Sequence, residues 1–394
     1  MSVTKDIAYP LLDTPAVLVD MNKLEANIKE MSQLAAEAGV KIRPHVKVHE
    51  CAEICRLQIE AGACGVDVGS LGQAEALAEV GIDDIIIAHP TFYGGPKYEK
   101  LKKLLSRPGL KVTVVVDMIE QAEIVSQIGQ ALGRKIPVLP KVDTNLGAGG
   151  FSRVGVLPGK TTLDLSKQLC QLPGIEFLGV YSHENSESTT SEGNDELAYK
   201  TAEIITETAR MLRKEGIPVE HVSVGSSPTF RASCRYIKEG KFPEITEIHP
   251  GNCVIGDILY SKVLGNPREA CVATVLASVM TTSHPNWAVI DAGFKTLGGE
   301  SLIGFREEPG FFWNGMPRYS LVKGRPDLWL GALSGELSQV YYTDHAKERL
   351  QFGERLEIVP NNAAIVINLQ DKLYGVRNGV VEREFTVTAR GCGT

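Results

Sequence analysis

The chain has 394 residues, which exceeds the size at which a single hydrophobic core keeps growing, so we expect two domains. Its 41 basic and 48 acidic side chains give a net charge of −7, which provides no reason to expect nucleic acid or an anionic membrane surface as a partner. The longest apolar runs, such as Ile85–Ala88, are far shorter than the ~20 residues that span a bilayer, so no membrane partner is expected.

The N-terminal residues and the cysteines predict a cellular compartment. The first residues, Met1–Asp6, lack the apolar segment of a signal peptide. The eight cysteines are irregularly spaced and include no Cys-x-x-Cys pair, which is typical of buried thiols. We therefore expect a reduced, cytoplasmic protein.

Short β-branched runs alternate with amphipathic helical patterns over most of the first 260 residues. This alternation indicates parallel βαβ units, and eight repeats predict a closed (β/α)₈ barrel of the TIM type in the α/β class. The predicted strands are Ile42–Val46, Gly65–Val68, Ile85–His89, Val112–Asp117, Val138–Asp143, Phe177–His183, Val222–Gly225 and Ile245–His249. Helical patterns between them include Glu50–Ala61, Gln73–Val80, Ile119–Ala131, Thr162–Leu172 and Leu197–Glu215.

Two segments fall outside this repeat. One is an early strand, Ala16–Asp20, and the other is everything from Cys271 onward, which predicts a C-terminal, mostly β domain. We therefore predict a barrel domain at 23–265 and a β-rich domain formed by 1–22 plus 266–394. The strands expected in the C-terminal part are Val272–Val279, Trp287–Asp291, Leu356–Val359, Ala364–Leu369 and Gly379–Thr386.

The first barrel strand carries an unusual basic face. Side chains alternate along a strand, so Arg43, His45 and Lys47 should share the face opposite the apolar residues and point into the barrel. Burial beside two other basic groups disfavours the charged form of Lys47. The strand therefore predicts a neutral amine able to attack a carbonyl, although an isolated strand-end lysine is usually a solvated surface residue.

Polar residues also follow other strands, at the end of a barrel where active sites gather. Lys141-Val142-Asp143 and Tyr181-Ser182-His183 both place polar side chains on one face of a strand end. The loop Gly225–Thr229 and the turn Pro250–Asn252 follow the seventh and eighth strands, where barrels commonly bind phosphate, although each alone also fits a plain turn.

With these motifs in their observed order, the chain resembles the D-threonine aldolase/D-serine dehydratase group of fold-type III pyridoxal 5′-phosphate (PLP) enzymes, which also include alanine racemase. The resemblance covers nearly the whole chain. The segments that carry it are Leu12–Ala16, Arg43–Lys47, Asp143-Thr144, Arg153–Val156, Gly179–Glu184, Val222–Thr229, His249–Asn252 and Asp291–Gly293.

The resemblance implies roles for individual residues. Lys47 would form the Schiff base with PLP, and Lys47 and His183 would be the catalytic groups. His249 stands where alanine racemase has an arginine facing the pyridine nitrogen, so the partner of that nitrogen stays open. The other implied cofactor-binding residues are Arg153 at the phenolate oxygen, Tyr181 beside the ring, Ser223, and Gly225, Ser226, Ser227, Gly251 and Asn252 at the phosphate.

One departure concerns the metal of the metal-dependent members. Their Pro-Asn-His-x-Cys motif reads Pro360-Asn361-Asn362-Ala363-Ala364 here, so Asn362 and Ala364 replace the two ligands. Alanine cannot bind a metal, and asparagine is a poor zinc ligand. We therefore expect no divalent metal at the family's usual position.

The resemblance implies a lyase that acts at Cα of a β-hydroxy-D-amino acid, as an aldolase or a dehydratase. A PLP-dependent racemase or epimerase is the first alternative, because it needs no metal, and a non-catalytic PLP carrier is the second. The expected partners are a small amino-acid substrate and a second copy of the chain, since the family completes its active sites across a homodimer.

Overall fold

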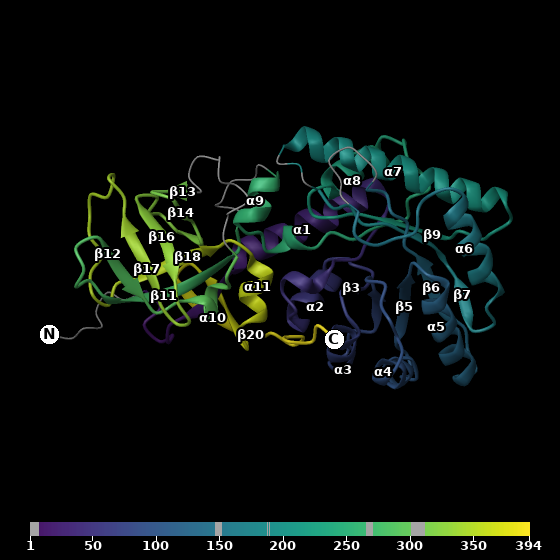
Figure 1. Ribbon diagram of the computed structural model, residues 1–394, viewed down its shortest axis with the longest axis horizontal. Helices are drawn as coiled ribbons and strands as arrows, with labels where there is room; N and C mark the ends of the chain where they lie inside the picture. The colour runs from purple at the N-terminus through teal and green to yellow at the C-terminus, as the bar shows by residue number, and fades with distance from the viewer. Residues whose placement is uncertain (1–7, 146–151, 187, 189, 265–270, 301–311) are drawn as a thin grey trace.

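The computed structural model describes residues 8–145, 152–186, 188, 190–264, 271–300 and 312–394. Two parts lie side by side along its long axis, a barrel surrounded by helices and a β-rich part (Figure 1). Within the described ranges, no helix is both long enough and apolar enough to cross a membrane. None of the eight cysteines, all of them described, forms a disulfide bond.

The barrel is a closed ring of parallel strands. Two runs of neighbours, β2-β10-β9-β8 and β3-β4-β5-β6-β7, contain only parallel pairs. Single bridges from His45 to Asp67 and from Lys141 to Tyr181 join the two runs. Since β7 and β8 are one strand interrupted at Leu178, the ring has eight positions, and the predicted (β/α)₈ barrel is confirmed. The strands are β2 (Lys41–Ile42), β3 (Val66–Val68), β4 (Asp84–Ile87), β5 (Lys111–Val116), β6 (Ile136–Pro140), β7 (Ile175–Phe177), β8 (Gly179–Tyr181), β9 (His221–Val224) and β10 (Glu247–Ile248).

Helices cover the outside of the ring, and their sequences explain where they begin and end. The first, α1, starts where the Asp20 side chain accepts a hydrogen bond from the Lys23 N–H, and it stops at Gly39, whose φ of 73° favours glycine. The predicted helix Ile119–Ala131 has the bounds observed for α5. The barrel helices are α1 (Met21–Ala38), α2 (Ala52–Glu60), α3 (Leu71–Glu79), α4 (Pro96–Leu105), α5 (Ile119–Ala131), α6 (Lys160–Gln171), α7 (Ser191–Lys214), α8 (Phe230–Lys238) and α9 (Ile258–Leu264).

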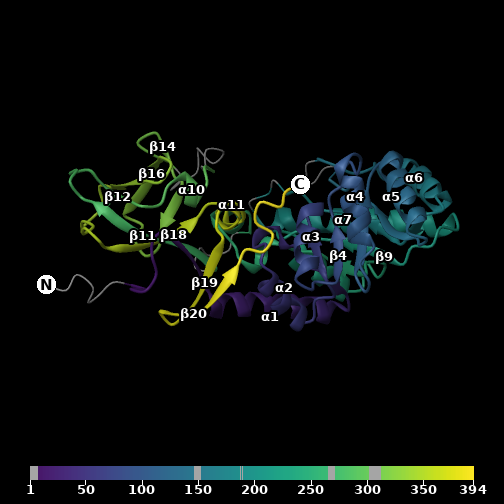
Figure 2. The same cartoon turned by 90° about the horizontal axis from the view of Figure 1, so that it is seen from below.

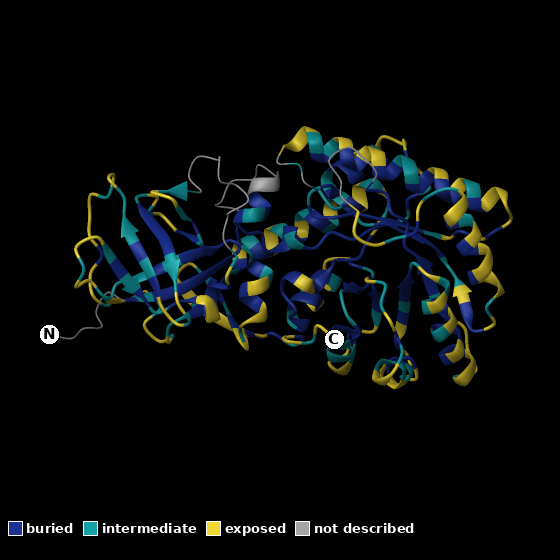
Figure 3. Cartoon of the chain, viewed as in Figure 1, coloured by how far each residue is buried: buried dark blue, intermediate teal, exposed yellow. Residues whose placement is uncertain are grey.

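The strands lie buried between the helices and the barrel interior, and the exposed residues gather on the outer helix faces (Figure 3). Alternate strand residues pack outward against the helices, for example Val66, Ile85 and Val112. The inward residues form a small apolar layer that includes Ile86 and Val115. Polar groups fill the rest of the interior, so the barrel core is partly polar.

The β-rich part is built around a second, smaller ring of antiparallel strands. Its order is β11-β12-β17-β16-β15-β18, and β18 pairs with β11 to close it. These strands are β11 (Ala273–Thr281), β12 (Trp287–Ile290), β15 (Ser320–Val322), β16 (Leu328–Leu333), β17 (Ser338–Tyr342) and β18 (Arg355–Pro360). The short elements β13 (Phe312–Trp313), β14 (Met316–Pro317) and α10 (Phe294–Leu297) belong to the same part.

Three more strands extend the sheet from β11. The early strand β1 (Ala16–Asp20) is antiparallel to β11 and parallel to β19 (Lys372–Arg377), and β20 (Val380–Thr386) forms the edge. Beyond β20 the chain returns to the barrel, where the Gly72 N–H donates to the Thr394 carbonyl at 2.8 Å (Figure 2). The predicted domain division has its second boundary at 265–266, which lies outside the described residues.

One predicted strand is wrong. The run Ala364–Leu369 is helical, as α11 (Ala363–Asn368), although its β-branched residues are typical of strands. The side chain of Asn362 caps this helix by accepting from the Ile365 N–H at 3.3 Å. Val366 and Ile367 are buried while Ile365 is 39% exposed, a spacing that fits one turn of helix rather than strict alternation.

The first predicted barrel strand is shorter than expected. β2 ends at Ile42, although the N–H groups of Arg43 and His45 still bond to Ile248 and Pro250 at 2.9 Å. Val46–Val48 then form a single turn of 3₁₀ helix, in which the His45 ring accepts from the Lys47 N–H at 3.3 Å. Lys47 therefore leaves the strand alternation and projects from a tight turn at the barrel mouth.

Candidate active site

A pocket of about 300 Å³ lies at the ends of the barrel strands, beside α11 of the β-rich part. It brings together six of the predicted site residues, which come from the 3₁₀ turn Val46–Val48 (η1) and from the segments after β8, β9 and β10: Lys47, His183, Ser226, Ser227, Gly251 and Asn252. The predicted Tyr181, Ser223, Gly225 and His249 lie buried just beneath it. The pocket therefore joins the predicted amine to both glycine turns.

Lys47 is an exposed residue where it opens into this pocket. The protein around its amine still disfavours the charged form and lowers the pKa of Lys47, and the positive charge of Arg153 lowers it further. The contribution that we expected from Arg43 is absent, because Arg43 lies at the other end of the barrel. There its guanidinium bonds to Asp84 at 2.7 Å and to Glu247 at 3.1 Å. The cation that acts on Lys47 is thus Arg153, an exposed residue of the loop after β6.

A second lysine at the site was not among the predicted residues. Lys141 follows β6, is buried, and has a pKa lowered to about 8 by that burial and by the charge of Lys47. Its Nζ lies 5.7 Å from the centre of the Tyr181 ring. The polar alternation of Lys141-Val142-Asp143 was the signal for this residue, since it places Lys141 on the interior face.

Three aromatic rings are stacked below the pocket. The ring of His249 lies parallel to that of Tyr181, with centres 4.2 Å apart, and the ring of His183 lies 5.7 Å from it on the pocket side. The Tyr181 hydroxyl donates to Asp67 at 2.9 Å, and the Ser223 Oγ is 2.7 Å from the His249 Nδ1. Burial lowers the pKa of His183 and of His249, so both imidazoles are neutral near pH 7.

The two loops after β9 and β10 are tied to each other. The Ser227 Oγ accepts hydrogen bonds from the Gly251 N–H at 3.2 Å and from the Cys253 N–H at 3.1 Å. Among the described residues, the N–H groups of Ser226, Ser227 and Asn252 have no hydrogen-bond partner. Three unpaired backbone donors on pocket-lining residues fit an anion such as a phosphate group.

Gly225 differs from the other loop residues because its N–H is already used. It donates to the Oε2 of Glu184 at 3.0 Å, and Glu184 is a buried, pocket-lining residue that was not predicted. Burial raises the pKa of Glu184 to about 7. A Cβ at Gly225 would come 2.9 Å from the backbone nitrogen of His249, and its φ is 136°. Gly225 therefore allows β9 and β10 to approach closely. No local pattern in the sequence indicated that the Glu184 side chain would bond to this loop.

The residues at the family's metal position also line the pocket. The Asn362 Nδ2 donates to Glu300 at 2.6 Å while its Oδ1 caps α11, and Ala364 offers no ligand atom. The carboxylate of Asp257 accepts from the Asn252 side chain at 2.9 Å and from the Ala363 N–H at 3.0 Å. Across the part of the chain that the structure describes, no three His, Cys, Asp or Glu side chains are grouped to hold a metal ion.

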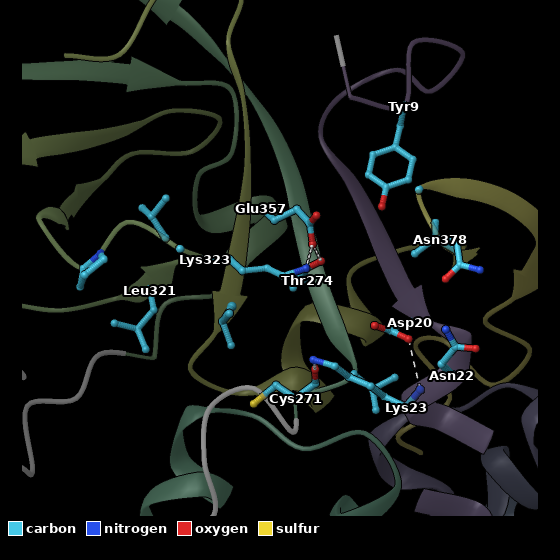
Figure 4. A pocket seen from close by; sticks show the side chains of 17 residues that line it. Tyr9, Asp20, Asn22, Lys23, Cys271, Thr274, Leu321, Lys323, Glu357 and Asn378 are labelled. Carbon is cyan, nitrogen blue, oxygen red and sulfur yellow. Dashed lines mark hydrogen bonds and ion pairs between the residues drawn. The ribbon is translucent and has the colours of Figure 1, made fainter. Parts of the chain in front are cut away.

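A larger cavity, of about 620 Å³, lies between α1 and the β-rich part (Figure 4). It contains none of the predicted site residues. Two of its charged groups pair with each other, since Lys323 lies 2.7 Å from Glu357, which also accepts from Thr274 at 2.9 Å. We therefore place the candidate active site at the barrel mouth.

Comparison with known proteins identifies the family of both parts of the chain. The family model described as "Alanine racemase, N-terminal domain" matches residues 19–258, and the one described as "Putative serine dehydratase domain" matches 272–376. The chain is 30% identical over 387 residues to the D-threonine aldolase of Arthrobacter sp, a match that covers 96% of this chain and 93% of that protein.

Solved structures give the same result. The crystal structure of D-threonine aldolase from Filomicrobium marinum superposes with a TM-score of 0.81 at 28% identity, covering 97% of this chain and 96% of that one. A cysteine-to-alanine mutant of D-threo-3-hydroxyaspartate dehydratase, in the metal-free form, superposes with a TM-score of 0.82 at 27% identity, covering 97% of this chain and 99% of that one.

Proposed function

Because the chain belongs to the family of the alanine racemase N-terminal domain, we propose that it is a PLP-dependent lyase acting at Cα of a β-hydroxy-D-amino acid. The predicted resemblance to the D-threonine aldolase and D-serine dehydratase group is confirmed by the matches of both domains and of whole relatives. The proposed reaction is either cleavage of the Cα–Cβ bond or loss of the β-hydroxyl group.

The observation that carries the proposal is the shared pocket of Lys47 and the two loops. An amine with a lowered pKa is a nucleophile for the cofactor's aldehyde, so we assign Lys47 as the Schiff-base lysine. The unpaired N–H groups of Ser226, Ser227 and Asn252 would hold the phosphate, with Ser227 bracing Gly251. Arg153 is assigned to the phenolate oxygen by the family resemblance.

Bound PLP supplies an electron sink for negative charge that develops at the substrate Cα. The protein's part is to orient the substrate and to move protons. Lys47 is the amine that can give or take a proton at Cα, and His183 is a neutral imidazole in the same pocket. The ring of His183 is supported from below by that of His249.

We further propose that the reaction needs no divalent metal at the family's usual position. Support comes from Asn362, whose oxygen and nitrogen are both engaged within the protein, and from Ala364. Chelation followed by removal of the chelator should leave turnover nearly unchanged. Complete loss of activity that manganese or zinc restores would contradict this proposal.

Racemisation is the second candidate function, because Lys47 and His183 are two proton carriers in one pocket and proton transfer at Cα needs no metal. Product assays separate the reactions. An aldehyde plus glycine identifies an aldolase, ammonia plus a keto acid identifies a dehydratase, and the mirror-image amino acid identifies a racemase. Absence of turnover with every D- and L-amino acid tested would favour the carrier.

The central test is the position of the cofactor. Borohydride reduction followed by peptide mapping should place the fixed cofactor on Lys47, and Lys47→Met should lose both the label and turnover. Lys141→Met is the matched control, because Lys141 is the other amine at the site with a lowered pKa, and this variant should keep the label on Lys47. A label on Lys141 in the unmodified protein would contradict the assignment.

The homodimer stays a prediction of the family resemblance, and the cytoplasmic location stays a prediction from the N-terminal residues and the cysteines. We propose that the active form is a dimer, which sedimentation of the cofactor-loaded protein at micromolar concentration should detect. A fully active monomer would overturn this proposal.

A further inference from the structure

A chain of buried polar groups connects the two ends of the barrel interior. At the pocket end stands His249, completely buried, with its Nδ1 2.7 Å from the Ser223 Oγ. The Ser223 hydroxyl also donates to the Oε1 of Glu247 at 3.4 Å. At the far end, the Oε2 of Glu247 accepts from the Arg43 Nε at 3.1 Å. These four residues form one continuous path beneath the predicted cofactor pocket.

The charge state of Glu247 sets the direction of the hydrogen bonds. Burial acts to raise its pKa, but the His221 ring, 3.2 Å away, and the Arg43 guanidinium outweigh burial and lower it to about 2. An ionised carboxylate can only accept hydrogen bonds. The arrangement in which the Ser223 hydroxyl donates to Glu247 leaves the Ser223 oxygen facing the imidazole as an acceptor.

This direction determines which nitrogen of His249 carries the proton. A neutral imidazole has one N–H and one lone pair, and the bond made by one nitrogen fixes the state of the other. Since Ser223 accepts, the Nδ1 must donate, and the lone pair lies on the Nε2. Within the described residues the buried Nε2 has no hydrogen-bond partner, so it is an unused acceptor below the pocket.

We propose that Glu247 is a positioning residue that, through Ser223, holds the proton of His249 on Nδ1 and keeps Nε2 as a hydrogen-bond acceptor beneath the cofactor site. A second step rests on the proposed function: were the ring nitrogen of bound PLP to face Nε2, an acceptor there would favour the protonated form of that nitrogen. A protonated ring nitrogen makes the cofactor a stronger electron sink, so Glu247 would tune the reaction without touching the substrate.

The first step is tested in the cofactor-free protein, by NMR of ¹⁵N-labelled histidine. His249→Asn identifies the His249 signals, which in the unmodified protein should report an Nδ1–H imidazole. Glu247→Gln should shift His249 toward the Nε2–H form. The amide oxygen takes the Oε2 position that faces Arg43 and Cys64, so the amide NH₂ faces Ser223, whose hydroxyl then turns to donate to Nδ1.

Two further variants make the result specific. Asp84→Asn removes the other carboxylate bonded to Arg43. Asp84 does not contact Ser223, so this variant should leave the His249 signals unchanged. Ser223→Ala removes the hydroxyl that links Glu247 to His249 and keeps the ion pair of Glu247 with Arg43. His249 should then show a mixture of the Nδ1–H and Nε2–H forms. This variant tests the proposal even if Glu247→Gln unfolds the protein. An Nε2–H form in the unmodified protein, or unchanged signals in Ser223→Ala, would overturn the proposal.

The second step is read from the ¹⁵N signal of the ring nitrogen in protein loaded with labelled PLP. It should report a protonated nitrogen in the unmodified protein and loss of that proton in Glu247→Gln. Failure of PLP to bind would refute the proposed function while leaving the imidazole measurement valid. An unprotonated ring nitrogen above an Nδ1–H imidazole would refute the second step alone.

Discussion

The charge of Arg153 bears on Lys47 although the two residues come from different loops. A positive charge near an amine disfavours its protonated form and so lowers its pKa. Sequence reasoning chose Lys47 correctly for the pocket but credited Arg43, because alternation assumes that a strand continues. Pro44, which has no N–H to donate, is followed by the turn that carries Lys47 out of the strand.

Removal of the Arg153 charge should therefore raise the pKa of Lys47. In cofactor-free Arg153→Gln, the pH profile for modification of Lys47 by a small amine reagent should shift to higher pH, so that modification is slower at pH 7.5. Peptide mass spectrometry measures the rate at Lys47. Arg153→Lys, which keeps the charge, should behave like the unmodified protein, and so should Arg134→Gln, which removes an exposed arginine outside the pocket. A shift equal in all three variants would contradict this role of Arg153.

The residues beside Lys47 were only partly predictable for a physical reason. Ser226, Ser227, Gly251 and Asn252 follow strands, so their place at the mouth follows from the barrel alone. Lys141 carried the same kind of signal. Glu184 carried none, because its contact with Gly225 depends on how far two strands approach each other, which no local pattern encodes.

At the scale of elements, the α-helical state of residues 363–368 shows how a cap can override β propensity. Asn362 supplies the side-chain oxygen that satisfies the Ile365 N–H, and burial of Val366 and Ile367 favours the helix. Periodicity predicted the long helices well, since α5 has its expected bounds. It did not identify β15, β16 or β17, which pair with one another in succession and whose outer members pair with the more distant strands β18 and β12.

Loss of the cap should destabilise the protein measurably. Asn362→Ala should lower the free energy of unfolding by about 1 kcal/mol, the usual cost of removing a helix N-cap. Asn362→Ser, which keeps a capping oxygen, should recover most of this loss. Urea unfolding of the cofactor-free protein measures both. Equal stability of the alanine and serine variants would show that the cap does not stabilise α11.

At the scale of the whole molecule, buried ionisable groups set the pH dependence of stability. Four of the eight histidines are buried or largely enclosed and have pKa values lowered mainly by that burial: His45, His49, His183 and His249. Their stabilising effect is complete above the unfolded pKa of about 6.5. It is lost as the pH falls toward the lower folded values, about 4 for His49 and about 3 for His249. Burial raises the pKa of Asp67 well above its usual value, that of Glu50 and Glu184 to about 7 and that of Asp257 to about 6, and these four groups act in the opposite direction.

The enclosed histidines and these carboxyls oppose each other, so the contribution of one group is measured by its own variant in the cofactor-free protein. Between pH 6.5 and pH 5 each net proton contributes ~1.4 kcal/mol per pH unit to the slope of the free energy of unfolding against pH. Urea unfolding at several pH values gives the slope. His49→Asn, outside the pocket, should reduce the slope by about one proton, and an unchanged slope would contradict the assignment.

The pairing of β1 has a consequence for synthesis on the ribosome. This strand is made before the barrel, yet its two partners, β11 and β19, are translated after it. At ~5–20 residues per second, β1 waits on the order of tens of seconds for β19. The nascent barrel can close during that interval, so the β-rich part must be the last to mature.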